Sequence, residues 1–232
     1  MSKSYGALKA VDAVSLAVAD GEALAVIGPN GAGKTTLFNL ITGDAAPSKG
    51  RMLFDGADMT AMAPHARSRL GIGRSYQIPH PFANMSVFEN LLVGAIYGGG
   101  KNERDSYPHC CDVLRVTGLY DKANVPARTL TLLQRKRLEL ARALAIQPKL
   151  LLLDEIAGGL TEFECGELVK TIKTIHANGT TIVWIEHIVH ALVSVASRLI
   201  VMNFGQILSQ GDPREVMAEP KVREVYMGMP VS

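Results

Sequence analysis

Three short runs along the chain are almost wholly apolar, and they set the framework for everything else. They span residues 23–27, 150–153 and 180–185, and the second is four leucines in succession. Such runs predict strands buried on both faces, as in a parallel sheet. Segments 130–145 and 166–178 instead place apolar residues three and four positions apart, which predicts amphipathic helices. The pattern therefore predicts an α/β protein.

An antiparallel patch is expected near the first apolar run. Residues 11–27 are interpreted as two strands joined by an Asp-Gly turn at residues 20–21. A third strand, at residues 51–54, ends at a second Asp-Gly pair. Asp-Gly between apolar runs is a strong signal for a hairpin, because glycine accepts the positive φ that the turn needs.

The middle of the chain, about residues 78–145, is predicted to be nearly all helical. Ser86 followed by Glu89 forms a capping box that starts one helix. The glycine-rich and polar stretch 98–108 breaks the pattern and is expected to be a surface loop. The basic side of the helix at 130–145 is interpreted as a solvated face, formed by Arg135, Lys136, Arg137 and Arg142.

Composition narrows the functional class. The 232 residues carry a net charge of +2, which gives no sign of a nucleic-acid partner. Three cysteines form no disulfide framework and suit a reducing compartment, and the adjacent residues 109–111 cannot all turn toward one metal ion. No apolar run approaches the ~18–20 residues of a membrane span and no signal peptide opens the chain. We expect a soluble, cytoplasmic protein.

The strongest motif follows the first apolar run. Residues 28–36, Gly-Pro-Asn-Gly-Ala-Gly-Lys-Thr-Thr, fit the phosphate-binding pattern G-x-x-x-x-G-K-[ST] between a predicted strand and a predicted helix. Backbone N–H groups of such a loop point at polyphosphate oxygens, and the helix N-terminus adds its positive end. Lys34 is expected on the β- and γ-phosphates and Thr35 on Mg²⁺. A chance glycine-rich turn is the alternative, but strand, loop and helix follow in the required order.

Two carboxylates follow the leucine run. Asp154 is expected to hold Mg²⁺ through a water, and Glu155 to orient or deprotonate the attacking water. Gln77 and His187 also follow predicted strands, where open parallel sheets bind ligands. Taken singly, each of these two is more often a solvated loop residue, and Tyr5 is more often a tyrosine on a strand face than a base-stacking ring.

Together these motifs resemble the nucleotide-binding subunit of an ABC transporter, over nearly the whole chain. The resemblance implies one ABC ATPase domain, residues 1–232: a P-loop NTPase with a mixed central sheet, an antiparallel β subdomain and a helical subdomain inserted at about 78–145. It implies ATP and Mg²⁺ as ligands and two subunits that face head to tail around two ATP molecules.

The resemblance also implies roles for individual residues. Tyr5 corresponds to the aromatic residue that stacks on adenine, Gln77 to the glutamine that senses Mg²⁺ and contacts the membrane subunit, and His187 to the histidine on the γ-phosphate. The residues that hold the phosphates are then Asn30, Gly31, Ala32, Gly33, Lys34, Thr35 and Thr36.

Four segments are similar to the ATPases of branched-chain amino-acid importers, and amide and urea importers share them: 73–77, 85–90, 154–161 and 222–228. Such importers pair two different ATPase subunits with two membrane permease subunits and a periplasmic solute-binding protein. The resemblance therefore implies a chain bound peripherally to the inner face of the cell membrane.

One segment departs from the family. The family's Leu-Ser-Gly-Gly-Gln, or Leu-Ser-x-Gly-Gln, is here Leu-Thr-Leu-Leu-Gln at residues 130–134. Thr131 and Gln134 keep polar groups for the partner's ATP, but Leu133 replaces a glycine. A leucine at positive φ would cost on the order of 1–2 kcal/mol and add bulk at the phosphate. The ATP site that uses Leu133 is expected to be slow.

Two alternatives remain from the sequence. One is a soluble ABC ATPase outside transport, although those usually carry two phosphate loops or a long coiled-coil insert. The other is a subunit that binds ATP with little hydrolysis, because of the degenerate segment 130–134.

Overall fold

The structure, a computed structural model, describes residues 1–227, and the last residue of the importer-like segment 222–228 lies outside that range. The chain forms two compact units. The first unit combines Met1–Arg67 with Val183–Ser232, and the second is Ser68–Ile182. In the part of the chain that is described, no helix is both long and apolar enough to cross a membrane.

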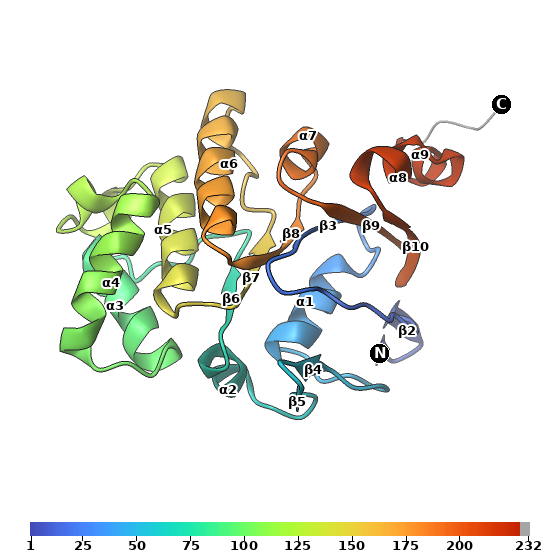
Figure 1. Cartoon of the computed structure of the whole chain (residues 1–232), viewed down its shortest axis with the longest axis horizontal. Coiled ribbons are helices and arrows are strands. Elements are labelled where there is room, and N and C mark those ends of the chain that lie inside the picture. Colours follow the sequence, from blue (N-terminus) through green and yellow to red (C-terminus); the bar gives the residue numbers. More distant parts are fainter. Residues whose placement is uncertain (228–232) are drawn as a thin grey trace. The chain divides into compact units, whose positions relative to one another are not determined.

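The first unit contains a mixed sheet with β9 (Arg198–Asn203) inside it (Figure 1). β9 pairs in parallel with β3 (Ala23–Ile27) and antiparallel with β10 (Gln206–Gly211). β8 (Thr181–Ile185), whose last three residues belong to this unit, is the other neighbour of β3. Every residue of β3 and β8 is buried, as the apolar runs predicted.

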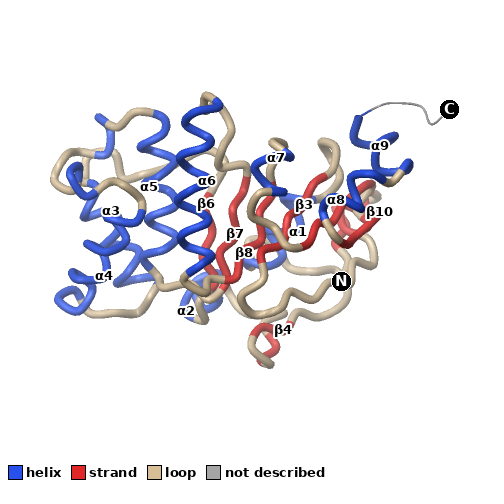
Figure 2. Tube along the Cα trace, turned by 45° about the horizontal axis from the view of Figure 1, so that its top comes forward, coloured by secondary structure: helices blue, strands red, loops and turns tan. Residues whose placement is uncertain are grey.

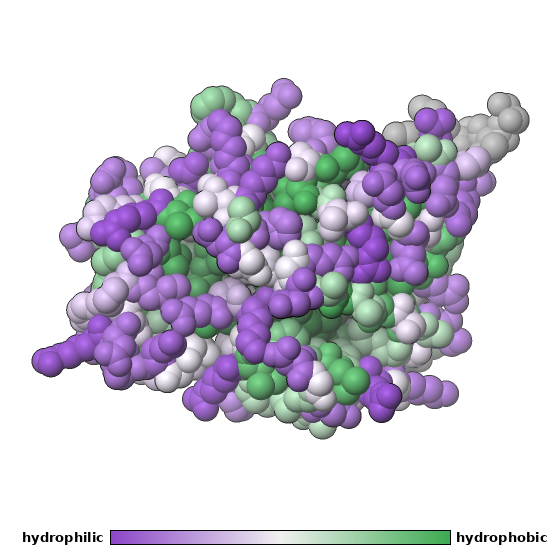
Figure 3. Space-filling model, viewed as in Figure 1, coloured by the Kyte–Doolittle hydropathy of each residue, from purple (hydrophilic) through white to green (hydrophobic). Residues whose placement is uncertain are grey.

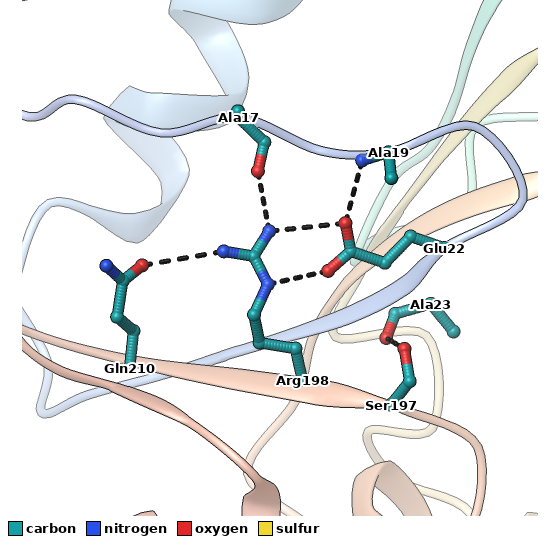
Figure 4. Close-up of polar contacts among 7 residues, drawn as sticks. All are labelled: Ala17, Ala19, Glu22, Ala23, Ser197, Arg198 and Gln210. Atoms are coloured by element: carbon teal, nitrogen blue, oxygen red, sulfur yellow. Dashed lines mark hydrogen bonds and ion pairs between the residues drawn. The ribbon is translucent and has the colours of Figure 1, made fainter.

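The strand expected before β3 does not form, so the predicted hairpin over 11–27 is wrong. Apart from a bend at position 13, residues 12–22 contain only a turn at positions 20–21. Arg198 explains the difference (Figure 4): it donates to the Ala17 carbonyl at 2.5 Å and to both oxygens of the Glu22 carboxylate at 2.6 and 3.2 Å. A side chain, not a neighbouring strand, thus takes the backbone oxygen of Ala17.

The same cluster fixes the start of β3. Burial by itself raises the pKa of Glu22, but hydrogen bonds from Arg198 and from the Ala19 N–H, with the attraction of Arg198, bring that pKa below its ordinary value. Ser197 Oγ also donates to the Ala23 carbonyl at 3.3 Å. Because β3 leads directly into the phosphate loop, this network anchors the loop's supporting strand to β9.

Helix α1 (Lys34–Thr42) follows the phosphate loop and ends where the sequence indicated. Gly43 takes the left-handed conformation at its C-terminus, and its N–H donates to the Asn39 carbonyl. Arg67, only 2% exposed, donates to the carbonyl oxygens of Leu40 at 2.6 Å and Ile41 at 3.0 Å. A buried cation at the C-terminus opposes the negative end of the helix dipole, so it stabilises the helix that carries the phosphate loop.

Besides the antiparallel pair of β9 and β10, the first unit contains two small antiparallel sheets. Strand β4 (Leu53–Phe54) is shorter than the strand predicted at 51–54, although its Asp-Gly turn at residues 55–56 forms with both residues at positive φ. The paired strands are β1 (Lys3–Tyr5) with β2 (Leu8–Val11), and β4 (Leu53–Phe54) with β5 (Ala57–Asp58). The remaining helices that lie wholly in the described part of this unit are α7 (Val189–Val193), α8 (Pro213–Ala218) and α9 (Pro220–Met227).

The second unit is built on two parallel strands and a group of helices. β6 (Ile72–Ser75) pairs with β7 (Leu150–Asp154), so that Ser75 lies opposite Leu153 and both strands end at one edge. Figures 1 and 2 show α3, α4 and α5 side by side, and all three pack on one another. Their bounds, with α6 and the minor elements, are α3 (Val87–Val93), a π-helix Gly94–Gly98, α4 (Glu103–Val116), 3₁₀ turns Tyr120–Lys122 and Ala127–Thr129, α5 (Leu132–Ala145) and α6 (Glu162–Ala177). Helix α2 (Pro64–Arg69) spans the boundary between the units.

The surface loop predicted at 98–108 is largely wrong, because α4 begins at Glu103 and contains Pro108. The Asn102 side chain caps the helix by accepting from the Asp105 N–H at 3.0 Å. Cys110 and Leu114 then lie fully buried one turn apart, and this tertiary packing outweighs the hydrogen bond that the proline removes. The capping box of Ser86 and Glu89 on α3 is confirmed.

Large apolar side chains at the surface are dispersed. The face drawn in Figure 3 is mainly hydrophilic, with hydrophobic residues in several separate patches. The most exposed aromatic side chains, Tyr97, Phe163 and Phe204, come from three different elements or loops. Scattered exposed residues of this kind need no partner to explain them.

Candidate functional site

The phosphate loop occupies the turn between β3 and α1, and its glycines are required by space. A Cβ on Gly28, at φ 154°, would collide with the Met202 carbonyl oxygen, and one on Gly33, at φ 101°, with the Ala10 carbonyl oxygen. The loop therefore lies directly against neighbouring backbone on two sides. Only glycine permits this path of the chain.

Lys34 lies within this loop. Its side chain is buried, and its Nζ donates to the carbonyl oxygens of Gly28 at 2.8 Å and Pro29 at 3.1 Å. The ammonium group is thus bound by the first two residues of the loop. Asn30, Gly31 and Thr35 are exposed, so the loop is open to a ligand from solvent.

A pocket of about 460 Å³ joins the phosphate loop to His187. It is lined by Gly28, Pro29 and Asn30 of the loop, by His187 and by Tyr226 of α9. The buried Glu186 lies at the end of β8 and accepts the His187 N–H at 3.0 Å. The structure therefore brings His187 to the phosphate loop, and its role on the γ-phosphate stays a prediction. It also adds Tyr226, which sequence reasoning missed.

Asp154, at the end of β7, forms a buried ion pair in the second unit. Its Oδ2 lies 2.6 Å from Nη2 of Arg74 on β6, and the two side chains are only 7% and 6% exposed. The Arg74 guanidinium also lies 4.8 Å from the ring centroid of Tyr76. Sequence reasoning did not assign a role to Arg74. The signal was present, because an arginine inside a strand with buried neighbours needs a carboxylate partner.

Glu155 and Gln77 meet at the same edge of the sheet. Gln77 Nε2 donates to Glu155 Oε2 at 2.6 Å, although the two residues are 78 positions apart. Glu155 has φ 45°, in the left-handed region that non-glycine residues seldom adopt. Strain of this kind persists where surrounding structure imposes it, and it is concentrated at functional sites.

Lys136 is not part of a solvated face, which corrects the prediction for the basic side of α5. It is 3% exposed, and its Nζ donates to the Gln77 carbonyl at 2.5 Å. Arg142, on the same helix, donates to the His80 carbonyl at 2.9 Å and pairs with the buried Glu139 at 3.0 Å. The loop that carries Gln77 is thus held by helix α5.

The segment 130–134 forms the start of α5. Thr131 caps the helix: its hydroxyl accepts the Gln134 N–H at 3.4 Å, and the Gln134 side chain accepts the Thr131 N–H at 3.0 Å. Leu133 lies inside the helix and is absent from the described residues with positive φ. The expected strain at Leu133 is therefore wrong, since a helical residue needs no glycine. The bulk of its side chain remains.

Tyr5 ends β1 and is half exposed, with Lys3 Nζ 4.9 Å from its ring centroid. A lysine over the ring is a cation–π contact. Its predicted role as a platform for adenine stays a prediction. Within residues 1–227, no three His, Cys, Asp or Glu side chains gather in a way that could hold a metal ion.

The phosphate loop between a buried strand and a helix defines a P-loop nucleotide-binding protein. Residues 11–158 match the ABC transporter family. BraF of Pseudomonas aeruginosa, a high-affinity branched-chain amino acid transport ATP-binding protein, is 32% identical, with 98% of this chain and 95% of BraF covered. LptB of Acidithiobacillus ferridurans, a lipopolysaccharide export system ATP-binding protein, is 33% identical, with 97% and 93% covered.

Solved structures agree with these relatives. A nucleotide-free ATP-binding cassette from an ABC transporter gives a TM-score of 0.89 at 32% identity, with 98% of this chain and 96% of the other covered. An ATP-binding cassette of an ABC transporter in its ADP conformation gives the same values. This chain belongs to the ABC transporter family and is one of its ATPase subunits. The predicted fold class, an ABC ATPase with a mixed sheet, is confirmed.

Proposed function

We propose that this chain hydrolyses ATP to drive an importer of branched-chain amino acids or related small amides. The observation that carries the ATPase role is the phosphate loop, which binds the Lys34 ammonium group through its carbonyl oxygens and lines one pocket together with His187. The importer class rests on relatives: BraF, and LivG of Salmonella typhimurium at 34% identity, are both named as branched-chain amino acid transport ATP-binding proteins. The alternative is a subunit of a lipid exporter, because LptB, at 33% identity, is named as a lipopolysaccharide export system ATP-binding protein.

The proposed roles follow from the side chains. Backbone N–H groups of residues 30–36 and Lys34 bind the phosphates of ATP. The hydroxyl of Thr35, the amide oxygen of Gln77 and the carboxylate of Asp154 are the hard oxygen donors that Mg²⁺ prefers, and bound Mg²⁺ would neutralise charge on the phosphates. Glu155, hydrogen-bonded to Gln77, orients the attacking water, and His187 stabilises charge on the γ-phosphate.

We further propose that the chain works beside a second ATPase subunit and permease subunits at the inner face of the membrane, and indirectly with a periplasmic solute-binding protein. ATP then favours the closed pair of subunits, and hydrolysis releases it. The domain organisation stays a proposal: one ABC ATPase domain in which residues 78–145 form the helical subdomain.

The test of the ATPase role is ATP affinity and phosphate release by the purified chain, with three variants. Lys34→Ala should lose affinity for Mg-ATP, because the cation on the phosphates is gone. Glu155→Gln should bind ATP, stop turnover and retain an ATP-bound dimer. Lys170→Ala changes an exposed lysine and should leave both properties as they are. Unchanged affinity in Lys34→Ala would refute the proposal.

The transported solute needs a second experiment. Thermal-shift screening of the system's solute-binding protein with leucine, isoleucine, valine, urea and short amides should give stabilisation by one of these groups. Co-purification of this chain with a permease would support the transporter role. If none of the solutes stabilises the binding protein and a lipid-exporting membrane protein co-purifies with the chain, the proposal of an importer is wrong and that of an exporter is supported.

A second candidate function is an ATP-binding subunit with little hydrolysis at one of the two sites, and Leu133 is the observation that favours it. Its side chain extends from the first turn of α5, whose N–H groups are the donors that the family uses on the partner's ATP. The N–H group of Leu133 is intact, but a bulky side chain there would keep these donors away from the phosphate, and losing one well-placed donor to a transition state costs about a hundredfold in rate. A homodimer of this chain should therefore be a poor ATPase.

The matched pair Leu133→Gly and Leu132→Gly tests this function. Both substitutions remove a leucine from the first turn of α5, but only position 133 carries glycine in both forms of the family's motif. Leu133→Gly should raise phosphate release by up to about a hundredfold, and Leu132→Gly should not. Equal effects of the two variants, or no gain from either, would count against a steric block at residue 133.

A further inference from the structure

The C-terminal helix α9 places one side chain at the phosphate-binding pocket. Tyr226, one residue from the end of α9, lines the pocket together with Gly28, Pro29, Asn30 and His187. Its hydroxyl donates to the His187 carbonyl at 3.1 Å, across 39 positions of sequence. The last helix of the chain therefore contacts the segment that carries the proposed γ-phosphate ligand.

The segment after β8 has weak local restraints. Ile188 precedes α7 in a conformation that is neither helical nor extended, and its side chain does not cap that helix. Helix α7 has only five residues, and short helices gain little stability from their own hydrogen bonds. The backbone on either side of His187 is held instead by Glu186, through the His187 N–H, and by Tyr226, through the His187 carbonyl.

The hydroxyl of Tyr226 is suited to a constant hydrogen bond. Burial, together with the negative charge of Glu186, raises the pKa of Tyr226 above its ordinary value. The phenol therefore stays protonated and remains a donor over the whole physiological range. A carbonyl acceptor has no proton to lose either, so this contact does not change with pH.

Building on the proposed ATPase function, we propose that Tyr226 is a positioning residue for His187. Its hydroxyl fixes the backbone of residue 187, and its ring forms one wall of the pocket, so that the imidazole faces the phosphate loop. Tyr226 acts through His187 and takes no part in the chemistry. Loss of one neutral hydrogen bond predicts a fall in turnover of about two- to tenfold, with ATP affinity unchanged.

The test compares Tyr226→Phe, which removes only the hydroxyl, with Tyr97→Phe, which makes the same change on a tyrosine that is 72% exposed. In nucleotide-free protein, the histidine Cε1–Hε1 NMR signal that disappears in His187→Ala is assigned to His187. Tyr226→Phe should shift this signal, and Tyr97→Phe should leave it in place. An unmoved His187 signal in Tyr226→Phe overturns the proposal.

Phosphate release supplies the second readout. Tyr226→Phe should slow turnover at saturating ATP, and it should have no further effect in a His187→Ala background. An equal slowing in that background, or a rise in ATP affinity, would mean that the ring obstructs or acts on the pocket directly, and would overturn the proposal. The NMR comparison uses no nucleotide, so it tests the positioning of His187 independently of ATP binding. Unchanged ATP affinity in Lys34→Ala would instead refute the proposed function.

Discussion

Replacing Arg74 with methionine should destabilise the folded chain by about 3–5 kcal/mol, because it leaves the Asp154 carboxylate buried without its cation. The pair belongs with buried ion pairs, whose disruption costs more than that of surface pairs. Its two charged atoms are 2.6 Å apart, and both side chains are over 90% buried. The cation–π contact with Tyr76 adds at most about 1 kcal/mol at this half-exposed ring. The ion pair therefore accounts for most of the expected loss.

Urea unfolding followed by circular dichroism measures this loss, with the free energy extrapolated to water. A double-mutant cycle with Asp154→Leu separates the pair from other contacts of Arg74. The double variant should be clearly more stable than either single variant, since apolar replacement of both partners removes the unpaired charge. Lys170→Met breaks an exposed ion pair with Glu167 and should leave the unfolding midpoint in place.

Two results would refute this reasoning about the ion pair. One is a cost below about 1 kcal/mol for Arg74→Met, which is the range of surface pairs. The other is strict additivity of the two substitutions, because residues in direct contact are expected to show an interaction energy of about 0.5–3 kcal/mol.

Two further predictions concern buried ionisable groups. Burial raises the pKa of Glu139 above 4.5, and this outweighs its ion pair with Arg142. The folded chain therefore holds this proton more tightly than the unfolded chain, so stability relative to Glu139→Gln should fall as the pH rises from about 4.5 through the raised pKa. Urea titrations at several pH values measure the unfolding free energy of the unchanged chain minus that of Glu139→Gln. A rise of this quantity with pH would contradict the prediction. Burial and the neighbouring Cys111 raise the pKa of Cys110 to about 11, so alkylation at pH 8 followed by mass spectrometry should label Cys111 first. Faster labelling of Cys110 would disprove this.

Local sequence patterns determined much of this protein. The three apolar runs became the buried strands β3, β7 and β8, and the capping box of Ser86 and Glu89 starts α3 as predicted. The phosphate loop could be identified because its requirements are local: glycine φ angles, a strand before it and a helix after it. Signals of this kind lie within a few residues of the structure that they determine, so they can be read from the chain alone.

Tertiary structure decided the contacts that join distant residues. Arg198 donates a hydrogen bond to the Ala17 carbonyl, 181 positions away, so that this carbonyl does not pair in a hairpin. Arg74 neutralises Asp154, which lies 80 positions away. Lysine is usually a surface residue, yet Lys136 is buried, and its Nζ donates a hydrogen bond to the Gln77 carbonyl. In each case a charged side chain and its partner come together only when strands or helices pack. The periodicity of the sequence therefore does not predict these contacts.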